Sequence, residues 1–270
     1  MKKFGFTLAE VLITLGIIGV VAALTAPALV MQSRNEANAA KLAVATSNLE
    51  NAFTTAILSE NVDNLYRTNM WLNGVSGGIN RAAFVGNLKR YINVTDWRDS
   101  TVANYYTDGI HPMTSSGGIN TAAEDTTLPA NHFDDDHNII IETKQGAVIV
   151  VRPYANADED GANAGNAGNH RTTVTNLGGG LFERAASVMI DVNGTSAPNT
   201  FGRDIFFYML GSNGILYPFG GLDVSAYISH VGDSIWSNSS SDWASCSDGA
   251  LAPGWGCAGR VVAEGYKINY

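Results

Sequence analysis

Charged side chains are scarce in this 270-residue chain, and positive ones are the scarcest. Lys and Arg number 16 against 25 Asp and Glu, and the formal net charge is -9 at pH 7. This balance argues against nonspecific nucleic-acid binding, which needs Lys and Arg to neutralise phosphates, although it leaves room for a local basic patch. Charged residues make up only 15% of the chain while glycine numbers 29, which suits an extracellular protein with long polar loops.

Sequence motifs for catalysis are absent as well. The glycine stretches at 178–180 and 220–221 lack the lysine and the helix start of a phosphate-binding loop. No G-x-S-x-G nucleophile or cysteine lies near the histidines, and we therefore expect no enzyme, with a triad assembled only in space as the open alternative. The histidines, all in loop-like sequence, are His111, His132, His137, His170 and His230.

The first 31 residues hold the one long apolar run, and this run carries a single charge. Lys2 and Lys3 precede it, and Glu10 lies near its start. An acid in a membrane-length apolar helix costs up to ~3 kcal/mol at the helix centre, so it indicates a function and needs a partner. No cation occurs between Glu10 and Arg34. The partner therefore comes from another molecule, or the acid sits protonated at the membrane interface.

The motif KKFGFTLAE at residues 2–10, with the apolar helix and Pro27 behind it, resembles the class III signal of type IV prepilins and type II secretion pseudopilins. The resemblance implies that a prepilin peptidase cleaves after Gly5 and methylates the new amine of Phe6. It also implies that Glu10 pairs with the N-terminal amine of a neighbouring subunit during filament assembly. Two poorly solvated charges from two chains neutralise each other only in register.

Two simpler interpretations of this stretch stay open. A secretory signal peptide also has a basic start and an apolar run, and TAPA at residues 25–28 offers an imperfect cleavage site. An ordinary membrane anchor is the other, since about 20 apolar residues span a bilayer and residues 11–31 reach that length. Neither of them requires Gly5 or Glu10, so we favour the prepilin signal.

The apolar pattern predicts one long helix over residues 6–59. Pro27 removes one backbone hydrogen bond, so we expect it to kink or loosen the helix. The predicted organisation is a leader over residues 1–5, a transmembrane or filament-core helix over 6–31, and a globular domain over 32–270. Apolar residues recur every three or four positions in the second half of the helix, namely Leu42, Ala45, Leu49, Ala52, Phe53, Ala56 and Ile57.

The remaining sequence predicts an α+β fold in which the long helix packs on an antiparallel β-sheet, as in type IV pilins. We expect the β region to start near residue 139, with a hairpin as its first unit. A short helix and a terminal strand close the chain over residues 258–270. The other predicted elements are a loop at 61–78, a helix at 81–92, a loop with small local elements at 93–138, and strands at 139–143, 147–152, 186–192, 204–210 and 215–219.

Oxygen-bearing side chains recur at alternate positions at the start of the segment between two predicted strands. Asp191, Asn193 and Asp204 are candidate calcium ligands, because Ca²⁺ takes six to eight oxygens. We favour turn chemistry, in which these side chains bond nearby backbone amides, since no bidentate glutamate stands at the EF-hand position. We expect no other cofactor. The D-x-N-G and P-N-x-x-G-x-D patterns in this segment resemble patterns found in bacterial pilin-like proteins. The acidic run at 134–136 beside His137 predicts a solvated turn.

Cys246 and Cys257 are the only cysteines. Neither belongs to a CxxC pair and no histidine is close, which makes a zinc site a poor interpretation. In an exported domain two cysteines predict a disulfide, and many type IV pilins close a C-terminal loop in this way. The flanking Trp236, Trp243 and Trp255 are predicted to pack beneath that loop.

The resemblance implies a structural subunit of a type IV pilus-like filament. Its expected partners are the prepilin peptidase, the bacterial inner membrane and other pilin subunits, and the single-pass precursor becomes part of a periplasm-spanning or cell-surface filament. The alternatives are a pseudopilin of a type II secretion system, a minor pilin that acts as an adhesin or in DNA uptake, and a membrane-anchored hydrolase.

Overall fold

The computed structural model describes residues 7–75, 79–98, 102–106, 110, 138–153, 173–175, 181–197, 199–219, 246, 254 and 256–269. Several predictions lie outside these residues: the cleavage site at Gly5 and Phe6, the acidic run at 134–136, the five histidines and the tryptophans near the cysteines.

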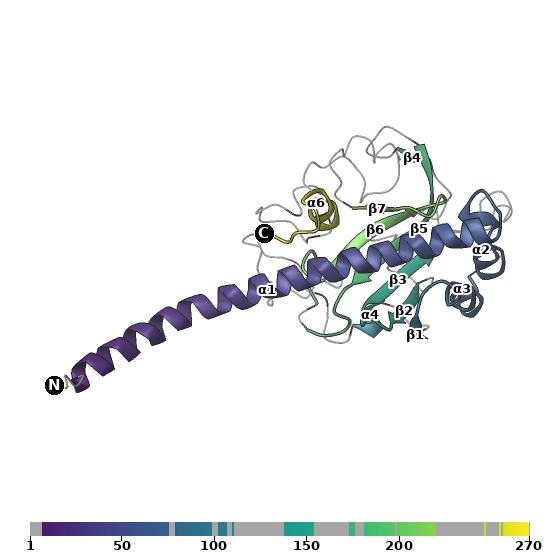
Figure 1. Ribbon diagram of the computed structural model, residues 1–270. Helices are drawn as coiled ribbons and strands as arrows, with labels where there is room; N and C mark the ends of the chain where they lie inside the picture. Colours follow the sequence, from purple (N-terminus) through teal and green to yellow (C-terminus); the bar gives the residue numbers. More distant parts are fainter. Residues whose placement is uncertain are drawn as a thin grey trace.

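The helix α1, Leu8–Ser59, dominates the structure, as the apolar pattern predicts. It begins at Thr7, an N-cap whose side chain accepts a hydrogen bond from the backbone of Glu10. Figure 1 shows one long, gently curved rod whose first half projects away from the rest of the chain. The helix continues unbroken through Pro27.

Short helices follow α1 where the sequence predicts a loop over residues 61–78. That prediction is wrong in part, because burial of Trp71 holds the chain in helical turns. Trp71 is 2% exposed and packs edge-on against Phe84, with ring centroids 5.5 Å apart. The predicted helix at 81–92 is present but ends earlier. The elements are η1, Leu65–Arg67, α2, Asn69–Gly74, and α3, Arg81–Leu88.

The strands form an antiparallel sheet in the spatial order β1-β2-β3-β5-β6-β7, and β4 pairs with β5 (Figure 1). The predicted hairpin is the β2–β3 pair, in which Ile140 faces Val150. The strands are β1, Val94–Arg98, β2, Ile139–Thr143, β3, Val148–Pro153, β4, Thr173–Thr175, β5, Leu181–Asp191, β6, Ile205–Gly211, and β7, Leu216–Pro218.

The start of the β region differs from the prediction. β1 precedes residue 139 and pairs with β2 at the edge of the sheet. Only Val94 and Trp97 of this strand are half-buried against the core. They are three positions apart, so the sequence shows no apolar alternation that would predict a strand. At the C-terminal end, α6, Cys257–Ala263, is the predicted short helix. Residues 264–269 contain no strand, although Ile268 is buried.

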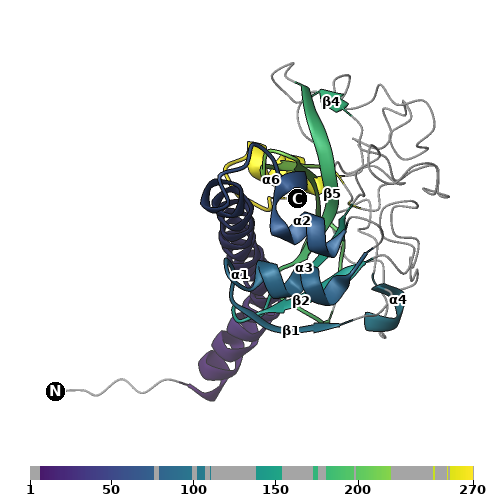
Figure 2. The ribbon, with the colours of Figure 1, turned by 90° about the vertical axis from the view of Figure 1, so that its right-hand side faces the viewer.

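The core lies on both faces of the sheet. On one face the second half of α1 packs its apolar stripe against alternate strand residues such as Ile141, Ile149 and Val188. On the other face Ile140, Val150 and other alternate residues form a second core with α4, Val102–Tyr105, and its neighbours. Figure 2 shows α1 and α4 on opposite sides of the sheet. The chain is therefore an α+β domain with a projecting helix.

Candidate functional site

The first half of α1 exposes a continuous apolar surface. Its large apolar side chains between residues 8 and 31 are 43% to 78% exposed. At 1.5 Å per residue this part of the helix is about 36 Å long, against a bilayer hydrocarbon core of about 30 Å. In the part of the chain that the structure describes, α1 is the one helix long and apolar enough to cross a membrane. A surface of this size needs lipid or other helices to cover it.

Glu10 and Thr7 form a capping box at the N-terminal end of this apolar helix. The Glu10 Oε2 atom accepts hydrogen bonds from the Thr7 backbone amide and the Thr7 hydroxyl, each at 2.8 Å. The Thr7 hydroxyl in turn accepts from the Glu10 amide at 3.3 Å. The carboxylate therefore lies at the positive end of the helix dipole, where a negative charge is favourable, and it remains exposed for contact with a second molecule.

The loop between β5 and β6 brings together the three candidate metal ligands. Asn193 Nδ2 donates to Asp204 Oδ2 at 3.2 Å, and the Thr200 amide donates to Asp204 Oδ1 at 2.6 Å. The Asn193 amide donates to Asp191 Oδ1 at 3.0 Å, and the Tyr106 hydroxyl donates to Asp191 Oδ2 at 2.9 Å. Each carboxylate oxygen thus accepts a hydrogen bond from the protein, which supports turn chemistry. The calcium interpretation stays a prediction.

Burial sets the protonation of these two carboxyls. It raises the pKa of Asp191 well above its usual range, and the nearby charge of Asp204 raises this pKa further. Burial also raises the pKa of Asp204, to about 7, against the lowering effect of the hydrogen bond from the Thr200 amide. Among the described residues no group of three or more His, Cys, Asp or Glu side chains is placed to hold a metal ion.

The loop is fixed to α1 where the helix leaves the domain. Asn38 Nδ2 donates to the Arg203 carbonyl at 3.1 Å. Three residues earlier on α1, Asn35 Nδ2 donates to the Ile268 carbonyl at 3.3 Å. These contacts set the direction in which the apolar half of α1 projects.

A disulfide joins Cys246 to Cys257, as predicted. It packs directly against the loop, because a Cβ atom on Gly202 would lie 2.6 Å from Cys257 Sγ. Arg260 on α6 donates to the Cys246 carbonyl at 2.8 Å. The C-terminal segment therefore packs against the loop at Gly202.

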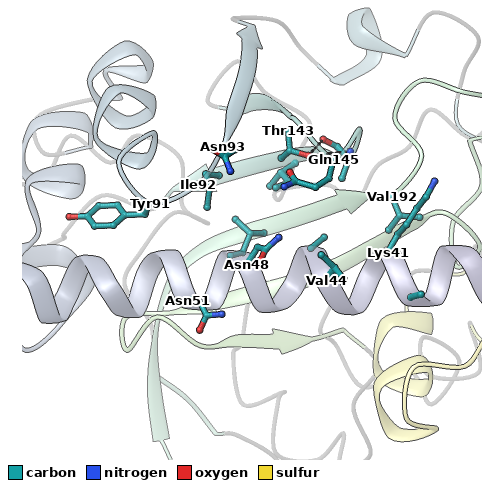
Figure 3. Close-up of a pocket in the computed structure, with 15 residues that line it drawn as sticks. Lys41, Val44, Asn48, Asn51, Tyr91, Ile92, Asn93, Thr143, Gln145 and Val192 are labelled. Carbon is teal, nitrogen blue, oxygen red and sulfur yellow. Dashed lines mark hydrogen bonds between the residues drawn. The ribbon is translucent and has the colours of Figure 1, made fainter.

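A cavity of about 470 Å³ lies between the second half of α1 and the end of the β2–β3 hairpin. Figure 3 shows Val44 and Asn48 on the helix facing Ile92, Asn93 and Gln145 across it. Its walls are mainly aliphatic and amide groups, and Lys41 is the one charged side chain among its lining residues. Among the described residues that line it, no nucleophile is paired with a base.

Part of this arrangement is predictable from the sequence. Glu10 and Pro27 lie on the predicted apolar helix, and Asp191, Asn193 and Asp204 lie in one segment between two predicted strands, as the structure has them. Tyr106 was not predicted, because it lies 85 residues before Asp191 and carries no local signal.

Among known proteins, a family model matches the N-terminal stretch of this chain. Residues 1–26 match the family model of the prokaryotic N-terminal methylation motif. The chain as a whole matches no curated protein and no solved structure. The match includes Gly5, Phe6 and Glu10, and with the long apolar helix and the antiparallel sheet it supports a pilin-like protein. The chain therefore carries the prepilin signal of type IV pilins and pseudopilins.

Proposed function

We propose that this chain is a structural subunit of a type IV pilus-like extracellular filament. A prepilin peptidase removes residues 1–5 and methylates the amine of Phe6. The mature subunit is anchored in the inner membrane by its apolar helix. It then enters a filament in which that helix packs against the corresponding helices of other subunits. The filament extends across the periplasm or from the cell surface.

One observation carries this proposal: the methylation motif at residues 1–26 runs into an apolar helix whose first half the described domain leaves uncovered. The described domain packs only the second half of α1 and leaves the first half exposed. Keeping apolar surface out of water is favourable by roughly 25 cal/mol per Å². The helix keeps this stabilisation during assembly if its lipid contacts are replaced directly by contacts with the helices of other subunits.

Glu10 sets the register of neighbouring subunits in this proposal. Its carboxylate lies at the start of the apolar helix, four residues after the amine that cleavage after Gly5 creates. A charge in an apolar filament core is tolerated only when it meets the opposite charge, so a subunit that enters out of register leaves an unpaired carboxylate.

The substitution Glu10→Ala tests this role. We expect normal cleavage and membrane insertion, because both precede assembly, and loss of filaments by at least tenfold, measured by shearing cells and quantifying the protein in the sheared fraction. Glu36→Ala is the matched control, since Glu36 is an exposed acid on the same helix beyond the apolar run. Wild-type amounts of filaments from Glu10→Ala would contradict the register role.

A further inference from the structure

A groove of about 660 Å³ lies where α1 leaves the globular domain. The helix contributes Pro27, Val30 and Arg34 to one wall, and the loop between β5 and β6 contributes Ala197 and Arg203 to the other. The bond between Asn38 and the Arg203 carbonyl closes the end of the groove that points toward the domain. We call this the exit groove.

The chemistry of the exit groove changes along the helix axis. Toward the N terminus its helix wall is apolar, with Ala23, Pro27 and Val30, whereas toward the domain it carries Arg34 and Asn38. A ligand that matches both ends has an apolar part and an anionic part, with the apolar part nearer the N terminus of α1. A glycerophospholipid has this order from its acyl chains to its phosphate.

The level of the groove agrees with a lipid ligand. The apolar run ends at Met31, and Arg34 is the first cation after Glu10. Since residues 8–31 extend about 36 Å, slightly more than the hydrocarbon core, Arg34 lies at the level of the lipid headgroups when the helix spans a bilayer. Arginine side chains near a membrane interface place their charge among the headgroups.

The charges that line the groove favour a phosphate. Arg34 is exposed, and within the described ranges no carboxylate forms an ion pair with it. Asp204 also lines the groove, but it is 3% exposed and its oxygens accept bonds from Thr200 and Asn193. Arg203 also lines the groove, so two of the three charged lining residues are positive.

We propose that the exit groove of the membrane-inserted precursor holds one anionic phospholipid, with its phosphate at Arg34 and the start of its acyl chains along Pro27 and Val30. This inference rests on the proposed function, because it requires α1 to span a membrane before assembly. The bound lipid covers the helix where it leaves the domain and is released when neighbouring helices pack there.

The test is native mass spectrometry of the full-length protein from bilayer nanodiscs that contain equal amounts of phosphatidylglycerol and phosphatidylcholine. We expect a single phosphatidylglycerol adduct to dominate. In Arg34→Gln this adduct should fall about fivefold, because one Lys or Arg near an anionic surface contributes ~1 kcal/mol, while Arg34→Lys should retain most of it. Lys41→Gln is the matched control, an exposed cation two turns further along the same helix.

The outcomes separate this inference from the proposed function. Equal adducts of both lipids, or equal loss in the Arg34 and Lys41 variants, would overturn the lipid site while the protein remains in the bilayer. Dimers in place of lipid adducts would assign the groove to a second copy and would also overturn it. Failure of the protein to stay in the bilayer after alkaline washing would instead contradict the membrane-inserted precursor, and with it the proposed function.

Discussion

Gly202 shows how a single missing side chain lets two segments meet. Its φ of +76° is in the left-handed region that glycine adopts at little cost. Its Cα also faces the disulfide so closely that a methyl group would overlap Cys257 Sγ. The glycine of the P-N-x-x-G-x-D pattern therefore has a structural role, because its lack of a side chain allows the C-terminal segment to pack on the loop.

Gly202→Ala should destabilise the fold through both effects. The left-handed backbone alone costs about 1–2 kcal/mol for a residue with a Cβ, and the overlap with the disulfide adds to it. Gly265→Ala is the matched control, because Gly265 has a φ of +70° but no atom lies within 4 Å of the position that its methyl group would take. Thermal unfolding of the full-length protein in detergent should show a larger loss for Gly202→Ala, and equal losses would contradict the packing argument.

The buried carboxyl of Asp204 makes stability depend on pH. Its folded-state pKa of about 7 lies above the ordinary value of 3.8. Between these values the folded chain holds a proton that the unfolded chain releases, so the free energy of unfolding falls as pH rises from about 4 to about 7 and then levels off. At 1.36 kcal/mol per pKa unit the effect is at most ~4 kcal/mol.

Unfolding of the Asp204→Asn variant between pH 4.5 and pH 8 tests this linkage. We expect a shallower fall in melting temperature than in the wild type, with part of the slope retained because burial also raises the pKa of Asp191. Asp63→Asn is the control, since the Asp63 side chain is 64% exposed and pairs with Arg67 at the surface. An unchanged slope in Asp204→Asn would show that this carboxyl does not titrate in that range.

At the scale of the element, the second half of α1 has a buried side and an exposed side. Leu49 is fully buried against the sheet, whereas Val44, between one and two turns away, is 53% exposed beside the cavity of Figure 3. Leu49→Ala should therefore cost ~2–5 kcal/mol of stability. Val44→Ala should cost less than ~1 kcal/mol. Chemical denaturation of both variants in the same detergent measures the difference, and similar costs would contradict the packing of α1 on the sheet.

The elements that could be predicted are those whose own sequence has a clear apolar period. The stripe from Leu42 to Ile57 and the β2–β3 hairpin have strong apolar periods, and both are confirmed. The helix α2 and the edge strand β1 were missed, since six residues seldom form a stable helix alone and β1 buries only parts of Val94 and Trp97. Their structure depends on Phe84 and on β2, which are distant in the sequence.

The same limit applies to the loop between β5 and β6. The spacing of Asp191, Asn193 and Asp204 placed them in one loop, and there the backbone amide and the side-chain nitrogen of Asn193 donate to the two carboxylates. Whether they meet as metal ligands or as hydrogen-bond acceptors depends on Tyr106 and Thr200, which the spacing does not specify. Burial, which sets the protonation of both carboxyls, also follows only from the assembled fold.

At the scale of the whole molecule, the described domain is closed around its own core while the first half of α1 is left without cover. A helix of this length and composition does not stay exposed to water. The proposed function gives this helix two successive environments, a bilayer and then other subunits, and the methylation motif at residues 1–26 supports that proposal.

Mass spectrometry of the mature N terminus, on protein taken from its native membrane, is the sharpest test of prepilin processing. We predict a chain that begins at Phe6 with a methylated amine, because the prepilin signal places cleavage after Gly5. A chain that begins near Leu29, or one that still carries Met1, would contradict prepilin processing and with it the filament subunit proposed here.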